Sequence, residues 1–248
     1  MRELFVDTNV LIGLCVRSDR WYRESQPVYD NDHQVHTSEL VVHEFCCSPK
    51  RFKEPPEDPS EIDVDWTKNQ GVFNKVSSEL KKPYSKYRRE IRSLEDDELS
   101  LDIATEQFID KFDIRSEAEP QIRGDFQKEF ENKAVTKQYI NNFVSSYIKD
   151  ILIAAQEKKA ELADFVTVHE SCYHEATQDK QRWQDFPENP PDEPDLSIIT
   201  DATQVIQEDS VGTVLSGDSD LITIQKIAQD YFDFDILSIA DEYSVQQT

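Results

Sequence analysis

The chain has 248 residues, 37% of them hydrophobic, and its 51 acidic and 27 basic residues give a formal net charge of −24. No run approaches the roughly 20 apolar residues of a membrane span, and no basic segment followed by an apolar stretch marks a signal peptide at the N-terminus. These features predict a cytoplasmic protein that does not use a membrane, and the charge opposes non-specific binding of a polyanion.

The acidic residues are concentrated in proline-containing stretches such as EPPEDPSEID and FPENPPDEPD, which are predicted to be solvated loops. An acidic surface suits a salt-loving cytoplasm, because screening there shortens the reach of charge, so we expect a halophilic source. A surface that binds a basic partner is the alternative interpretation.

The first 48 residues alternate strand and helix in pattern. Apolar residues precede Asp7, and Thr8 or Asn9 is placed to cap the helix that follows. The apolar residues of the second helix recur at helical spacing. In chain order, the predicted elements are a strand at 3–7, a helix at 8–16, a strand at 33–38 and a helix at 39–47.

The middle of the chain is predicted to be helical, because its apolar residues recur three and four positions apart. Proline- and acid-rich segments at 49–66 and 185–195 are expected to be loops. The predicted helices are 68–92, 100–113, 117–150 and 151–176.

The C-terminal part returns to strand–helix alternation. A short segment that starts at residue 195 leads into a helix predicted to begin near Asp201. The next predicted elements are a strand at 212–220, a helix at 221–230 and a strand at 234–239. Such alternation on both sides of a helical middle predicts a parallel α/β sheet with a long helical insertion. The predicted domains are 1–48 with 195–248, and 49–194.

Acidic side chains stand at the ends of these predicted elements. Asp7 ends the first strand, and Asp218 and Asp220 end a late one. Ligands of parallel α/β sheets gather at the carboxyl ends of strands, where helices can also bring Glu44 and Asp201. Clustered carboxylates repel one another unless a cation lies among them, and Mg²⁺ and Mn²⁺ prefer oxygen ligands. The pattern therefore predicts a divalent-metal site.

These residues resemble the PIN domains, a family of metal-dependent nucleases. The resemblance lies in VDTNVLI, in HTSELVVHEF, and in an Asp about 17 residues before S-G-D-S-D; it covers roughly 1–48 and 195–240. It implies a three-layer fold, a parallel sheet sandwiched by helices, with the helical segment as an insertion. The implied catalytic and metal-binding residues are Asp7, Glu44, Asp201 and Asp218, with Asp220 as an auxiliary ligand.

The resemblance also implies an activity, namely hydrolysis of phosphodiester bonds, most often in RNA, with Mg²⁺ or Mn²⁺ as cofactor. Thr8, Asn9 and Ser216 are expected to orient carboxylates or waters. Gly217 stands where the family commonly has Asn, which removes one amide. Short members of the family are toxin nucleases of toxin–antitoxin pairs, so an antitoxin or other protein partner, and a homodimer, stay open.

Several alternatives stay open as well. Asp7 taken alone could simply cap a helix, and Glu39 could replace Glu44 as a ligand. A non-catalytic PIN-like module that binds RNA or protein would share the same residues. A haloacid-dehalogenase-type phosphohydrolase also begins with a strand ending in Asp, but its motif needs a second Asp where this chain has Asn9.

The segment ELKKPYSKYRREIR is basic, with a net charge of +5 over residues 81–92. Its cations are suited to backbone phosphates, and Tyr84 and Tyr87 to stacking on unpaired bases, which predicts a contact with RNA. The alternative is an amphipathic helix that pairs with the acids at 95–98. The predicted nucleic-acid-binding residues are Lys81, Lys82, Lys86, Arg88, Arg89 and Arg92.

Overall fold

The computed structural model describes residues 2–16, 19–31, 33–47, 54–114, 116, 118–209 and 211–244. Within these residues, five strands form one all-parallel sheet in the order β3-β2-β1-β4-β5, which confirms the predicted parallel α/β class. The strands are β1 (Glu3–Val6), β2 (Gln34–Ser38), β3 (Val166–His169), β4 (Thr213–Ser216) and β5 (Asp235–Ser238).

The chain divides into two compact units. Residues 1–74 and 154–248 form the first, which we call the sheet unit, and residues 75–153 form the second, the helical unit. The helical unit spans fewer residues than the insertion expected at 49–194. The domain boundary expected between residues 48 and 49 lies outside the described residues.

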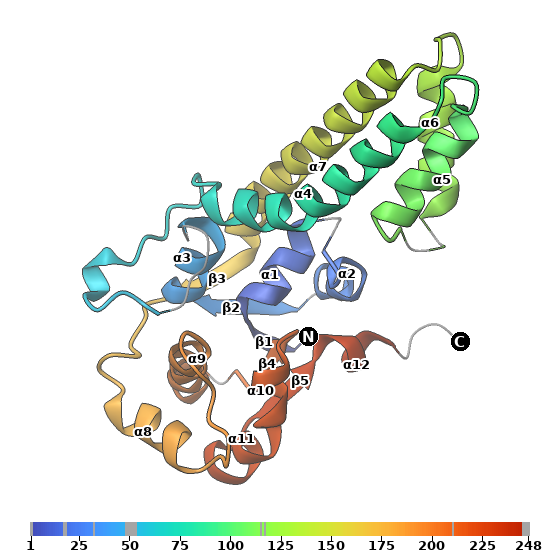
Figure 1. Ribbon diagram of the computed structural model, residues 1–248. Coiled ribbons are helices and arrows are strands. Elements are labelled where there is room, and N and C mark those ends of the chain that lie inside the picture. The colour runs from blue at the N-terminus through green and yellow to red at the C-terminus, as the bar shows by residue number, and fades with distance from the viewer. Residues whose placement is uncertain are drawn as a thin grey trace. The chain divides into compact units, whose positions relative to one another are not determined.

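Helices lie on both faces of the sheet in the sheet unit (Figure 1). Helices α1 to α3 accompany β1 and β2 on one face, whereas α8, α9 and α11 lie on the other. Their bounds are α1 (Thr8–Cys15), α2 (Tyr22–Asp30), α3 (Glu39–Cys47), α8 (Thr177–Asp185), α9 (Asp195–Asp209), α10 (Ser219–Thr223), α11 (Gln225–Phe232) and α12 (Ile239–Ser244).

The centre of the sheet is apolar because helices cover both of its faces. Phe5 and Val6 on β1 are fully buried, as is Leu215 on β4. The chain leaves β1 toward one edge of the sheet and β4 toward the other, so the carboxyl ends of these neighbouring strands form a topological switch point. In open parallel sheets a crevice for ligands forms at such a point.

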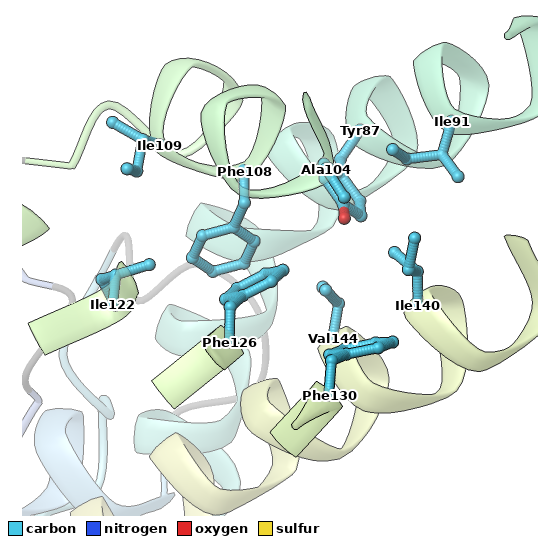
Figure 2. Close-up of a cluster of buried hydrophobic side chains, with 10 residues drawn as sticks. All are labelled: Tyr87, Ile91, Ala104, Phe108, Ile109, Ile122, Phe126, Phe130, Ile140 and Val144. Carbon is cyan, nitrogen blue, oxygen red and sulfur yellow. The ribbon is translucent and has the colours of Figure 1, made fainter. Parts of the chain in front are cut away.

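The helical unit has a core of its own, shown in Figure 2. It contains α5 (Leu101–Lys111), α6 (Glu119–Phe130) and parts of α4 (Gln70–Ser93) and α7 (Lys137–Phe165). None of the helices in the described ranges is both long and apolar enough to cross a bilayer. The buried core residues are Tyr87, Ile91, Ala104, Phe108, Ile109, Ile122, Phe126, Phe130, Ile140 and Val144.

One strand of the sheet lies where the sequence predicts a helix. Helix α7 runs through position 151 without a break and ends at Phe165, and Val166 to His169 then pair with β2. The prediction of a helix over 151–176 is therefore right for 151–165, which belong to α7, and wrong for 166–176. The β-branched residues Val166, Thr167 and Val168 suit a strand that packs against a neighbour.

Candidate metal centre

Asp7 follows β1 directly and stands at the start of α1. Its Oδ1 accepts a hydrogen bond from the Val10 backbone N–H at 2.9 Å, so Asp7 itself caps the helix, and the expected capping by Thr8 or Asn9 is wrong. Its Oδ2 accepts a hydrogen bond from the Ser216 hydroxyl on β4. Burial raises the pKa of Asp7 to about 6, although both hydrogen bonds oppose this shift.

Asp218 lies two residues beyond β4, beside Asp7's strand. It caps α10 through an Oδ1 that accepts from the Asp220 N–H at 2.8 Å, and its Oδ2 accepts from the Asn9 side-chain amide at 3.4 Å. The Ser216 hydroxyl accepts a hydrogen bond from the Asp218 N–H at 2.9 Å. Asn9 and Ser216 thus hold the ends of β1 and β4 together through polar contacts with the two carboxylates.

Glu44 reaches this region from α3. The Thr8 hydroxyl, next to Asp7, donates a hydrogen bond to the Glu44 carboxylate. Glu39, the alternative ligand in the sequence, instead accepts from the Ser171 backbone N–H at 3.4 Å. Thr8 therefore connects Glu44, rather than Glu39, to the residues that follow β1.

Asp195 is the acid that the sequence analysis missed. It is the first residue of α9, and carboxylate oxygens of Asp195, Asp218 and Asp220 lie within 4.8 Å of one another. The pKa of Asp195 is raised to about 8, first by burial and then by the neighbouring charges of Asp218, Glu44, Asp7 and Asp220, in that order of importance. Five carboxylates thus share one electrostatic environment, and we call these five residues the acidic cluster.

Asp201 has different surroundings, although the sequence predicts it as a ligand. Its carboxylate is 1% exposed and accepts hydrogen bonds from the Ser171 hydroxyl at 2.7 Å and from the backbone N–H groups of Cys172 and Tyr173 at 2.9 and 2.8 Å. Burial raises its pKa and these hydrogen bonds lower it. Asp201 thereby anchors the segment that follows β3, and it is not part of the acidic cluster.

The position at which α9 begins explains why Asp195, rather than Asp201, lies in the acidic cluster. The helix begins at Asp195, six residues earlier than predicted. Six helical residues correspond to about 9 Å along the axis and about 120° around it, so Asp195 and Asp201 cannot easily share one ion. The sequence signal was Pro194, directly before Asp195, since proline is favoured at helix starts and disfavoured within helices.

Gly217, between Ser216 and Asp218, has a packing role. A Cβ at this position would lie 2.5 Å from the indole nitrogen of Trp21, so the close approach of Trp21 requires glycine. The Arg20 guanidinium lies over the Trp21 ring at 4.8 Å from its centroid, and the indole N–H is buried with no hydrogen-bond acceptor among the described residues. The Trp21 indole therefore packs against Gly217, the position at which PIN domains commonly have Asn.

The donor set of the acidic cluster fits a hard divalent cation. All five side chains offer carboxylate oxygens, the ligands that Mg²⁺, Mn²⁺ and Ca²⁺ prefer. Burial, with a smaller contribution from neighbouring carboxylates, raises the pKa values of Asp7 and Asp195, and the positive charge of a bound cation would lower them. Thr8, Asn9 and Ser216 hold three of the five carboxylates in place through hydrogen bonds.

The predicted nucleic-acid-binding residues all lie on α4 in the helical unit. Arg88 is half-buried, with its guanidinium 5.5 Å from the centroid of the Tyr84 ring, and the other five cations are exposed. Tyr87 is fully buried in the core of the helical unit, so the expectation that it stacks on a base is wrong.

Comparisons of the chain with protein-family models, with curated proteins and with solved structures found no match. The fold and the site residues define an α/β protein with an all-parallel sheet and an acidic cluster at its switch point.

Proposed function

We propose that the protein is a divalent-metal-dependent nuclease with a PIN-like fold, an endoribonuclease that hydrolyses phosphodiester bonds of RNA. The acidic cluster supports this proposal most strongly. Carboxylates from four separate segments gather at the sheet edge where parallel α/β proteins hold ligands, and burial together with the charges of these neighbours raises the pKa of Asp195 to about 8. The preference for RNA comes from the resemblance to PIN domains.

The residues of the cluster have distinct proposed roles. Asp7, Asp195 and Asp218 would hold Mg²⁺ or Mn²⁺, with Asp220 at the exposed rim. A cation there would supply Lewis-acid chemistry, which activates water and offsets charge on the phosphate. Glu44, oriented by Thr8, is the proposed base that accepts the proton of the attacking water.

The positions of the supporting side chains favour precise orientation of these ligands. The Ser216 hydroxyl contacts both Asp7 and the backbone of Asp218, and Asn9 contacts the Asp218 carboxylate. Partners of this kind fix the rotamers of metal ligands and strengthen binding about 10- to 100-fold. Asp201, by contrast, would act only by anchoring the segment after β3.

Cleavage of labelled RNA by the purified protein, with Mn²⁺ and with EDTA, tests the proposal. We expect Asp7→Asn and Asp195→Asn to lower the rate about 100-fold or more, because each removes a ligand. Asp192→Asn is the matched control, since Asp192 is an exposed acid three residues before Asp195 and outside the acidic cluster. Its rate should stay within about twofold of the wild-type rate.

Two results would count against the proposal. Cleavage at an equal rate in EDTA would exclude the metal, and a fully active Asp195→Asn protein would exclude the assigned site. Binding of RNA by the wild-type protein with no cleavage in Mn²⁺ would instead favour the non-catalytic binding module. Circular dichroism of each variant shows whether its fold is retained.

A further inference from the structure

Helix α4 carries exposed cations that have no acidic partner in the described part of the chain. The ion pairs of the helical unit use other bases, such as Arg123, Lys133 and Lys137. In a chain with 51 acidic residues against 27 basic ones, unpaired cations grouped on one helix are unexpected on charge statistics alone. The exposed and unpaired cations are Lys81, Lys82, Lys86, Arg89 and Arg92.

These five residues lie on one side of the helix. At about 100° per residue, they fall within a sector of about 140°, and the buried residues Tyr87 and Ile91 fall on the opposite side. Figure 2 shows these two side chains directed into the core of the helical unit. The five cations thus form a continuous strip about 16 Å long, which we call the α4 basic face.

The charge of the whole chain is not spread evenly between the two units. Residues 75–153 contain 14 Lys and Arg against 16 Asp and Glu, which is a net charge of −2 out of the total of −24. The remaining −22 belongs to the sheet unit. Repulsion of a polyanion therefore comes mainly from the sheet unit, and the α4 basic face stands in a nearly neutral unit.

Two of the acids at 95–98, which were the alternative partners of these cations, have other contacts. Asp96 pairs with Lys137 at 3.1 Å, and the Glu98 carboxylate accepts a hydrogen bond from the Glu95 N–H at 2.8 Å. No described ion pair joins this acidic turn to the α4 basic face. The cations stay available for an anionic partner.

The tyrosines of the segment restrict what such a partner could contact. Tyr87 is fully buried, and Tyr84 is half-buried, with Arg88 over its ring and its hydroxyl 3.5 Å from the Asn141 carbonyl oxygen. Tyr87 thus has no exposed face for base stacking, and the Tyr84 ring is engaged by Arg88 and by the core of the helical unit. The surface therefore presents charge without a platform for bases, which suits a sugar–phosphate backbone.

We propose that the α4 basic face binds the phosphate backbone of nucleic acid without sequence preference. The choice of nucleic acid over an acidic protein as the partner rests on the proposed nuclease function. The inference that the partner is anionic rests on the cations of α4 alone. Binding through phosphates releases counterions, so the affinity falls steeply as salt rises, with a slope of about 0.7 per neutralised phosphate of a single strand.

The test measures binding of fluorescent 20-nucleotide single-stranded RNA and DNA of mixed sequence to the full chain carrying Asp7→Asn, in EDTA. The variant adds Lys82→Ala and Arg89→Ala, which lie within about 20° of each other on the helix. The matched control adds Lys128→Ala and Lys149→Ala, two exposed cations of the same unit that also have no ion pair among the described residues.

We expect the Lys82/Arg89 variant to lower the salt slope by about 1.4 and to bind about 25-fold more weakly at 0.1 M salt, with RNA and DNA affected alike. The control should stay within about twofold of its parent. An unchanged slope in the Lys82/Arg89 variant, or equal losses in variant and control, would overturn the proposal. So would a parent that binds polyglutamate but neither nucleic acid.

A separate assay keeps this inference distinct from the nuclease proposal. Hydrolysis of bis(p-nitrophenyl) phosphate in Mn²⁺ by the protein with an intact Asp7 reports on the acidic cluster, because this small diester does not need an extended basic surface. We expect Lys82→Ala with Arg89→Ala to leave this hydrolysis unchanged. If the wild-type protein hydrolyses no diester but the binding loss appears, the α4 assignment stands and the nuclease proposal fails.

Discussion

Ser216 donates a hydrogen bond to the carboxylate of Asp7 and so joins the last residue of β4 to the residue that follows β1. The same hydroxyl oxygen accepts a hydrogen bond from the Asp218 N–H at 2.9 Å. This contact depends on the register of the sheet, which sets Val6 opposite Leu215. One buried hydroxyl thereby positions two members of the acidic cluster.

Ser216→Ala should weaken Mn²⁺ binding, and more strongly at pH 6 than at pH 8. The hydrogen bond from Ser216 lowers the pKa of Asp7, which burial has raised to about 6, so its loss raises that pKa further. At pH 6 more of the variant's Asp7 is then protonated and cannot bind a cation. We expect about tenfold weaker binding at pH 6, measured by isothermal titration calorimetry.

Thr213→Ala, at the other end of β4, is the control for this measurement. Its Mn²⁺ affinity should match that of the wild-type protein at both pH values. An affinity of Ser216→Ala that is also unchanged at both pH values would contradict the role given to this hydroxyl.

Asp195→Asn should stabilise the metal-free protein at pH 8. The folded-state pKa of Asp195 is about 8, above its ordinary value of 3.8, so the folded state holds this proton more tightly than the unfolded state does. The resulting stabilisation is present below pH 4 and is lost as pH rises toward 8, where the cluster must ionise. Because Asp195 keeps some solvent contact, we expect a gain of only about 1 kcal/mol, or roughly 2–4 °C in Tm.

Thermal denaturation in EDTA at pH 4.5 and pH 8 measures this effect. The variant should gain stability at pH 8 and little at pH 4.5, and Mn²⁺ should raise the Tm of the wild-type protein but not of the variant. A variant less stable than the wild-type protein at pH 8 in EDTA would show that the Asp195 charge is not repelled by its neighbours.

Gly217→Ala should destabilise the sheet unit and disturb the cluster. The added Cβ would meet the Trp21 ring at 2.5 Å, and overpacking of this kind costs about 1–3 kcal/mol. Gly212→Ala is the control, because a Cβ there meets nothing within 4 Å. Denaturant unfolding should show a lower midpoint for Gly217→Ala only, and equal midpoints for the two variants would exclude the steric role of Trp21.

Much of the sheet could be predicted because its strands carry strong local signals. The apolar residues before Asp7 and before Ser216 predict β1 and β4, and the acids that follow them predict a ligand site at one edge. Glu44 could be preferred over Glu39 by its place on the helix after β2. These features could be predicted because each depends on residues that are close together in the sequence.

Two features could not be predicted from pattern alone. Strand β3 has four residues and follows a 29-residue helix directly, so no loop or turn residue marks where the helix ends and the strand begins. Asp195 closes an acid- and proline-rich stretch that is typical of a loop, whereas Asp201 stands among helical residues. Pro194 marks the helix start before Asp195, but the hydrogen bonds that Ser171, Cys172 and Tyr173 donate to Asp201, and that identify Asp201 as the anchoring acid, are tertiary contacts.

The most direct test of the central claim is an anomalous difference map from crystals grown with Mn²⁺. We expect a manganese peak about 2.2 Å from carboxylate oxygens of Asp7, Asp195 and Asp218, and no peak at Asp201. A peak coordinated by Asp201, or no peak beside the acidic cluster at millimolar Mn²⁺, would contradict the account.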